Sequence, residues 1–121
     1  MIEIHIVKNP RDRRVCLEAK GHAMTAPEGQ DLLCAAVSSQ VLGFSKAVSA
    51  MGKARIKSGR IRVEFGDGVV DVTLTTAKDY KRVEAYLAPV EAALFAYELS
   101  FPEFLRVTAT KSRMAHETGC L

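Results

Sequence analysis

A cysteine and a histidine stand on either side of one short loop in the first third of the chain. His22 follows a predicted strand, and Cys34 comes three residues after Asp31, where a helix is predicted to begin. If Asp31 is the N-cap or the first helical residue, Cys34 falls in the first turn, where the positive end of the helix favours a thiolate. His22 would then serve as general base or as the imidazolium partner of that thiolate. The pair predicts a Cys/His dyad for nucleophilic catalysis.

The residues that follow Cys34 suit the same chemistry. The helix start offers backbone N–H groups that can stabilise a developing oxyanion during acyl transfer. Ala35 and Ala36 are small enough for a substrate backbone to come close. Ser38, one turn after Cys34, shares its side of the helix, where it can bond a dyad member, bond a preceding carbonyl or simply pack.

Two of these residues have alternative roles that the sequence leaves open. Asp31 is either the third member of a triad that orients His22 or a helix cap, and its carboxylate also opposes a thiolate three residues away. Cys34 lies at the edge of the apolar stripe of the predicted helix, and free cysteine is among the most buried residue types. Spacing alone therefore indicates a core cysteine.

The other cysteines and histidines have no predicted catalytic partner. The three cysteines are an odd set without CxxC spacing, which argues against a disulfide framework and a structural zinc site. Cys16 is predicted on the polar face of a strand and Cys120 in the C-terminal tail; His5 and His116 are predicted to be exposed. No cofactor or metal is expected, because the sequence has no Gly-rich phosphate loop and no metal-ligand spacing.

Alternating apolar residues predict five strands, which have a side-chain period of two. They occupy residues 2–6, 15–20, 61–65, 70–74 and 105–109. Asn9 and Pro10 supply the turn between the first two strands. The third and fourth are predicted to form a hairpin around Gly66, Asp67 and Gly68, because these glycines tolerate the positive φ of a tight turn.

Apolar residues spaced three and four apart predict two helices. The first begins at Asp31 and stops near Gly52, and its apolar stripe is Leu33, Val37, Val41, Phe44, Val48 and Met51. The second covers residues 79–100, with the stripe Val83, Leu87, Val90, Leu94 and Tyr97. Pro89 lies inside this run and predicts a kink or a break, because proline removes a backbone hydrogen bond.

The order ββαββαβ predicts an α+β fold, in which a mixed sheet carries two helices packed on one face. With 121 residues, 48% of them hydrophobic, residues 1–121 are expected to form one domain with a real core. Residues 111–121 lack periodicity and are predicted to be a mobile tail. No apolar run approaches the ~18 residues of a membrane span, and the N-terminus lacks the pattern of a signal peptide, so a cytoplasmic protein is expected.

The positive charge is concentrated in the first half of the chain. The net charge is +3, and residues 46–62 contain basic side chains but no acidic one: Lys46, Lys53, Arg55, Lys57, Arg60 and Arg62. Such a stretch either contacts RNA or an acidic partner, or forms an ordinary solvated surface.

A family resemblance bears on these alternatives. The stretch Gly21-His22-Ala23, then Gly29, Asp31, Cys34-Ala35-Ala36 and Ser38, resembles the signature of the Prp-like, ribosomal-processing cysteine proteases of Firmicutes and related bacteria. Phe101-Pro102 also falls where that family tends to carry an aromatic-Pro pair before its last strand. The resemblance covers nearly the whole chain; the Cys120-containing tail and Pro89 depart from it.

The resemblance implies a specific activity. Members of the family remove a short N-terminal extension from large-subunit ribosomal protein twenty-seven, after a Phe-Phe-Ala-like sequence, with a Cys/His dyad. Carried over by position, the nucleophile is Cys34 and the base is His22, while Gly21, Asp31 and Ser38 are motif residues of less certain role. The resemblance also implies a homodimer and a ribosomal protein precursor as peptide substrate.

Two other functions remain as alternatives. A non-catalytic domain that binds RNA or the ribosome would use the basic stretch 46–62. A thiol redox protein is less favoured, because no resolving cysteine lies near Cys34 in the sequence. In the catalytic hypothesis, residues 23–30 form a loop that orders over bound peptide, with Gly21 and Gly29 as hinges.

Overall fold

Five strands and two helices make up the described part of the chain. The computed structural model describes residues 1–21, 32–51, 56–63, 70–76 and 80–111. In chain order the elements are β1 (Ile2–Asn9), β2 (Arg14–Gly21), α1 (Leu32–Ser49), β3 (Ile56–Val63), β4 (Val70–Thr76), α2 (Tyr80–Ser100) and β5 (Leu105–Lys111). The predicted ββαββαβ order and the α+β class are confirmed.

All five strands form one mixed sheet in the order β3-β4-β2-β1-β5. The pairs β1–β2, β2–β4 and β3–β4 are antiparallel, whereas β1 and β5 are parallel. The predicted hairpin is confirmed by the pairing of Val63 with Val70, although its turn at residues 66–68 lies outside the described residues. Lys111 pairs with Lys8 as part of β5, so the predicted tail does not begin at residue 111; residues 112–121 are not described.

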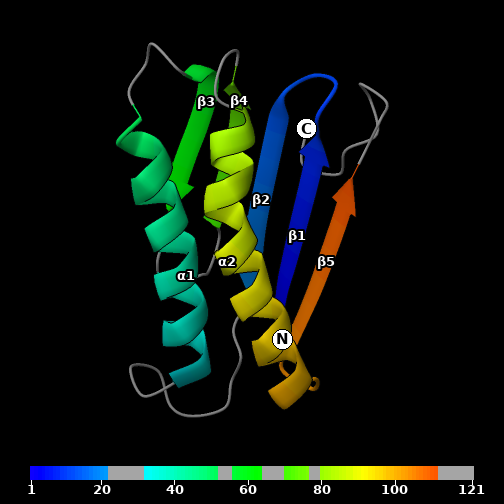
Figure 1. The fold of residues 1–121 in the computed structure, drawn as a ribbon. Coiled ribbons are helices and arrows are strands. Elements are labelled where there is room, and N and C mark those ends of the chain that lie inside the picture. Colours follow the sequence, from blue (N-terminus) through cyan, green and yellow to red (C-terminus); the bar gives the residue numbers. More distant parts are fainter. Residues whose placement is uncertain (22–31, 52–55, 64–69, 77–79, 112–121) are drawn as a thin grey trace.

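The connections between the strands explain why both helices cover the same face of the sheet (Figure 1). Helix α1 carries the chain from β2 past β4 to β3, and α2 carries it from β4 past β2 and β1 to β5. The two connections cross the sheet in opposite directions, and the strands from which they start, β2 and β4, are antiparallel. Because crossovers between parallel strands are right-handed, these two reversals together place both helices on the same face of the sheet. The predicted placement of both helices is thus confirmed.

The core lies between this face of the sheet and the helices. The predicted stripe of α1 is buried from Leu33 to Val48, and Met51 is half-buried against it. From α2 the stripe is buried from Val83 to Leu94, with Tyr97 partly buried. The sheet contributes the side chains that alternate toward the helices: Ile2, Ile4, Ile6, Val15, Leu17, Ala19, Leu105 and Val107.

Helix α2 runs through Pro89 without a break, so of the predicted kink or break the break is wrong, and the kink stays a prediction. Pro89 and Ala85, whose carbonyl loses its i+4 donor at this proline, are both exposed. Water can therefore bond that carbonyl. The buried residues Leu87 and Val90 on the opposite side hold the helix against the sheet across the missing bond.

Two polar contacts fix α2 along the edge of the sheet. The Lys8 ammonium on β1 donates to the Glu91 carboxylate at 2.9 Å, and both side chains are mostly buried. Near the C-terminal end of α2, the backbone N–H of Val107 on β5 donates to the Glu98 carboxylate at 2.5 Å. The register of α2 on β1 and β5 is therefore set by charged groups as well as by packing.

Helix α1 is long and apolar enough to satisfy a length and hydropathy test for a membrane span, with a mean hydropathy of 1.3 over Leu32–Ser49. The core helix of a globular protein satisfies the same test. Its buried stripe packs into the core of this fold, which accounts for the apolar composition.

Replacing Gly43 by alanine should stabilise the protein. Gly43 is exposed within α1, and a Cβ built there meets nothing within 4 Å. Since glycine in a helix interior costs more backbone entropy than alanine, Gly43→Ala should raise the free energy of unfolding by about 0.5–1 kcal/mol. Thermal unfolding followed by circular dichroism measures this, with Ala88→Gly, an exposed position of α2, as the reverse control. A lower melting temperature for Gly43→Ala would contradict the described environment.

Candidate active site

Cys34 is the third residue of α1 and lies in its first turn, as predicted. Its side chain is half-buried and packs against the edge of the core. The preceding Leu33 is 5% exposed and belongs to the core, whereas Leu32 is 83% exposed. Cys34 thus sits at the boundary between core and solvent, where one side of the thiol is held by packing and another remains accessible.

The chain topology brings the flanks of the proposed dyad to one end of the sheet (Figure 1). β2 ends at Gly21, opposite Ile2, and α1 starts at the same end because a crossover helix runs back along the strand before it. His22 follows Gly21 directly in the sequence. His22 and Asp31 themselves lie outside the described residues, so their side-chain geometry is not assigned.

The start of α1 is electropositive. The first four N–H groups of a helix have no acceptor within it, and the helix carries a partial positive charge at this end. No acidic side chain lies in the first turn of α1. Ala35, next to Cys34, is exposed and carries only a methyl group. The turn can therefore offer N–H groups to an oxyanion that forms beside the sulfur.

The side chain of Ser38 is half-buried one turn after Cys34. In this stretch of α1 the bond from a hydroxyl to a preceding carbonyl is made by Ser39, whose Oγ donates to the Ala36 carbonyl at 2.9 Å. The structure assigns no catalytic contact to Ser38, and its role stays a prediction.

Apolar side chains are exposed at the same end of the molecule, a feature that the sequence analysis missed. They come from the start of β1, the start of α1 and the end of α2 (Figure 1): Met1 (46% exposed), Leu32 (83%), Leu99 (84%) and Phe101 (43%). Leu32 and Leu99 fall outside the apolar stripes of their helices. This departure from the helical period is a sequence signal for an exposed apolar surface, because a leucine outside the buried stripe of a helix faces solvent unless a ligand covers it.

The second described cysteine lies elsewhere and is buried. Cys16, on the interior strand β2, has Val7 of β1 opposite it and is 1% exposed. Alternation correctly puts Cys16 on the face of β2 that carries Glu18, away from the helices, but the Cys16 side chain is buried on that face rather than solvated. His5 on β1 is exposed, as predicted. Within the described ranges, no group of three or more potential metal ligands occurs.

Alkylation should distinguish the two thiols. Neither Cys16 nor Cys34 is in a disulfide. Iodoacetamide should label Cys34 well before Cys16, because the Cys16 side chain is buried in the folded protein. Trypsin separates the cysteines onto the peptides 15–20, 21–46 and 114–121, so mass spectrometry can score each one. Unfolded protein provides the control in which all three react. An unreactive Cys34 in the folded protein would favour a non-catalytic domain.

The chain is similar to known proteins in sequence and in fold. The family model described as cysteine protease Prp matches residues 1–106. No curated protein matches the sequence.

Solved structures share the fold at low sequence identity. The essential ribosomal processing protease Prp from S. aureus, in complex with a covalently linked product peptide, aligns with a TM-score of 0.71 and 22% identity, over 90% of this chain and 99% of that one. The Streptococcus mutans protein SMU.848 aligns with a TM-score of 0.71 and 19% identity, over 93% and 96% of the two chains. The S. aureus protease with a substrate peptide gives 0.69 and 19%, over 90% and 99%.

The family match, which covers most of the chain, makes the protein a cysteine protease, and the fold described above carries a cysteine in the first turn of its first helix. Within that class, the chain belongs to the Prp family of cysteine proteases.

Proposed function

We propose that the chain is an endopeptidase that removes the N-terminal extension of the precursor of large-subunit ribosomal protein twenty-seven, with Cys34 as nucleophile and His22 as base. The observation that carries the proposal is the position of Cys34, half-exposed in the first turn of α1 and within the matched residues 1–106. Support for a peptide substrate comes from the S. aureus protease, whose structures contain a substrate peptide or a covalently linked product peptide.

The proposed reaction follows from the chemistry of the helix start. His22 takes the Cys34 proton, and the sulfur attacks the carbonyl carbon of the scissile bond while first-turn N–H groups stabilise the oxyanion. The intermediate collapses to a thioester as His22 returns the proton to the leaving amine. Water, deprotonated by His22, then attacks the thioester carbonyl, and the thiolate leaves and recovers its proton. The second peptide product is thus released as a carboxylic acid.

Other residues at this end suit a peptide substrate. The exposed apolar side chains of Leu32, Leu99 and Phe101 can cover apolar substrate residues beside the scissile bond, which stabilises the complex by removing apolar surface from water. Ala35 leaves room for an extended backbone. Asp31 caps α1 or orients His22; this choice stays open.

Digestion of a synthetic precursor peptide tests the proposal. The protein is incubated with a copy of the precursor N-terminus from the same organism, and the products are identified by mass spectrometry. One cut at a single bond is expected, and a peptide with the scissile-bond residues scrambled should remain intact. A well-folded protein that leaves the native peptide uncut, yet binds RNA through residues 46–62, would support the non-catalytic alternative instead.

The cellular setting is also part of the proposal. A ribosomal precursor is made where ribosomes assemble, so we propose cytoplasmic action by a homodimer. Light scattering of the purified protein should give twice the mass of the 13.2 kDa chain. Lys46, the first basic residue of the stretch, is exposed and available for an RNA or ribosome contact.

A further inference from the structure

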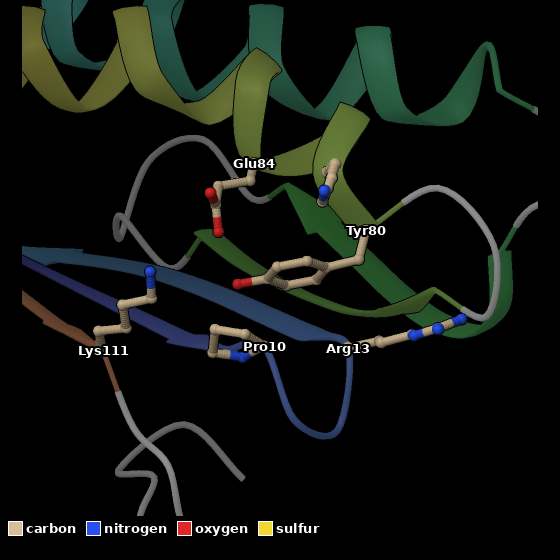
Figure 2. A pocket seen from close by; sticks show the side chains of 6 residues that line it. Pro10, Arg13, Tyr80, Glu84 and Lys111 are labelled. Carbon is tan, nitrogen blue, oxygen red and sulfur yellow. The ribbon is translucent and has the colours of Figure 1, made fainter.

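A pocket of about 430 Å³ opens at the end of the sheet opposite to Cys34. The β1–β2 turn, the start of α2 and the end of β5 meet there, and Figure 2 shows the side chains that face the hollow. The lining residues are Pro10, Arg13, Tyr80, Lys81, Glu84 and Lys111. None of them takes part in the proposed proteolysis.

The wall formed by the β1–β2 turn is held by its own hydrogen bonds. The Asn9 Oδ1 accepts from the Asp12 backbone N–H at 3.1 Å, and the Arg13 N–H donates to the Pro10 carbonyl at 3.4 Å. Arg13 adopts a φ of 53°, the left-handed conformation that ends such a turn. Asn9 is 1% exposed, so this bonding is enclosed by the fold. The β1–β2 turn that forms one wall of the pocket is therefore held in place by hydrogen bonds within the protein.

The lining carries an excess of positive charge. Arg13, Lys81 and Lys111 are cationic and Glu84 is the one carboxylate in the lining, which leaves a net charge of +2. Tyr80 and Lys81 are the first two residues of α2, whose positive helix end adds to the same potential. The pocket thus favours an anion, and more strongly a dianion than a monoanion.

The Tyr80 hydroxyl is a second and independent sign of a ligand. Tyr80 is 8% exposed, and its buried hydroxyl has no partner with hydrogen-bond geometry among the described residues, although the Glu84 carboxylate lies near it. Figure 2 shows this hydroxyl directed into the hollow, toward the side occupied by Lys111 and Glu84. Burial, and then the nearby Glu84 carboxylate, raise the pKa of Tyr80, so the hydroxyl keeps its proton at neutral pH and remains a donor. A buried donor without an acceptor costs stability, which a ligand oxygen would recover.

We propose that this pocket binds a phosphate group, with the Tyr80 hydroxyl and the ammonium groups of Lys81 and Lys111 as its donors. A phosphate oxygen accepts from the hydroxyl, and the two ammonium groups neutralise the charge. Arg13 contributes at longer range, since its guanidinium points away from the Tyr80 hydroxyl in Figure 2. Glu84 opposes the anion and limits the affinity. The preference for a dianion favours inorganic phosphate or a small phosphate monoester. A phosphodiester of an RNA backbone, which carries one negative charge, is the alternative source that the second arm of the test examines.

The first arm of the test is a titration with inorganic phosphate, followed by amide chemical shifts in ¹⁵N-labelled protein at constant ionic strength. Saturable shifts should cluster at residues 10–13, 80–84 and 111, and acetate, a monoanion, should bind at least about fivefold more weakly. Acetate that matches phosphate, with the same shifts, would overturn the assignment to a phosphate group.

Variants test the donors one by one. Lys111→Gln should weaken binding at least about fivefold, and Tyr80→Phe about threefold to tenfold, because each removes one donor. Glu84→Gln should strengthen binding. Lys46→Gln removes the same charge from an exposed position on α1 and should leave the affinity unchanged. Tyr80→Phe keeps the ring and should melt at the same or a higher temperature without phosphate, which separates lost binding from lost folding.

The second arm replaces phosphate by a short RNA, with fluorescence anisotropy as the readout. RNA that binds with the same dependence on Tyr80 and Lys111, and is displaced by phosphate, would assign the site to a nucleic-acid backbone. Binding of phosphate without binding of RNA would assign it to a small ligand. If neither probe gives saturable binding, or if Lys111→Gln and Tyr80→Phe leave both affinities unchanged, the proposal is wrong. The pocket is remote from Cys34, so this result is independent of the protease activity.

Discussion

Cys34→Ala is expected to lower kcat/KM for the precursor peptide by at least about 10,000-fold, because removal of the nucleophile leaves only the binding surface and the N–H groups of α1. Initial rates of peptide cleavage measure the loss. Alanine keeps the helical propensity of the first turn, and Cys34 packs only at the edge of the core. The unfolding midpoint should therefore change little, and the lost activity can be assigned to chemistry.

Two further variants test whether the lost activity is due specifically to the missing Cys34 thiol. Cys34→Ser should lose nearly as much activity, since a hydroxyl is a far weaker nucleophile than a thiolate in a site with one imidazole base. Cys120→Ala, which lies beyond the family match at residues 1–106, should cleave at the wild-type rate. Turnover that persists in Cys34→Ala would exclude Cys34 as the nucleophile.

His22→Ala should reduce cleavage by about 100- to 10,000-fold, the range typical of a missing general base. A residue at a junction between a strand and a loop contributes less packing than a core residue, so the protein should still unfold cooperatively. His5→Ala is the matched control, because His5 is exposed on β1 and should be silent in both assays.

The two readouts separate a catalytic histidine from a structural one. If His22→Ala abolishes the cooperative thermal transition, His22 supports the fold and the dyad lacks its base. If it leaves both folding and cleavage intact, another group deprotonates Cys34. Partial recovery of cleavage by added imidazole would identify the missing function as proton transfer.

The helices and the strand β1 were predictable because each is buried on one side. In β1, Ile2, Ile4 and Ile6 are buried while Glu3 and His5 are exposed, so the period of two marks the strand directly. The stripes of α1 and α2 follow the helical period for the same reason. Alternation and the helical period together predicted the order of strands and helices along the chain. The preference for right-handed crossovers explains why both helices lie on one face of the sheet.

Features that depend on neighbours distant in the sequence were not predictable. Cys16 is buried on the face of β2 away from the helices, and alternation within β2 does not report this, because the exposure of a sheet face depends on what packs against it. The break expected at Pro89 does not occur because the lost bond faces water. The pocket at Tyr80 forms where residues 10–13, 80–84 and 111 meet, and the exposed apolar side chains at the end of the molecule that carries Cys34 come from both helices and the start of β1.

The candidate site was predictable only in part. Helix periodicity located the first turn of α1, and with it the placement of Cys34, but spacing alone favoured a core cysteine. The half-buried position of Cys34 agrees with both a core cysteine and an accessible thiol, since one side of the residue packs against the core and the other is accessible. The prediction that Cys34 is a nucleophile rests on the family motif rather than on periodicity.

Covalent trapping tests most directly the claim that Cys34 is the nucleophile of a peptidase. A peptide with the precursor sequence up to the scissile bond, ending in a chloromethyl ketone, is incubated with the folded protein, and the digest is analysed by mass spectrometry. The account predicts one adduct per chain, formed by displacement of chloride by Sγ, on the tryptic peptide 21–46 that contains Cys34. The adduct should be absent in Cys34→Ala and slow to form in His22→Ala. Labelling of Cys16 or Cys120 in its place, or cleavage of the precursor peptide without any adduct on residues 21–46, would contradict the account.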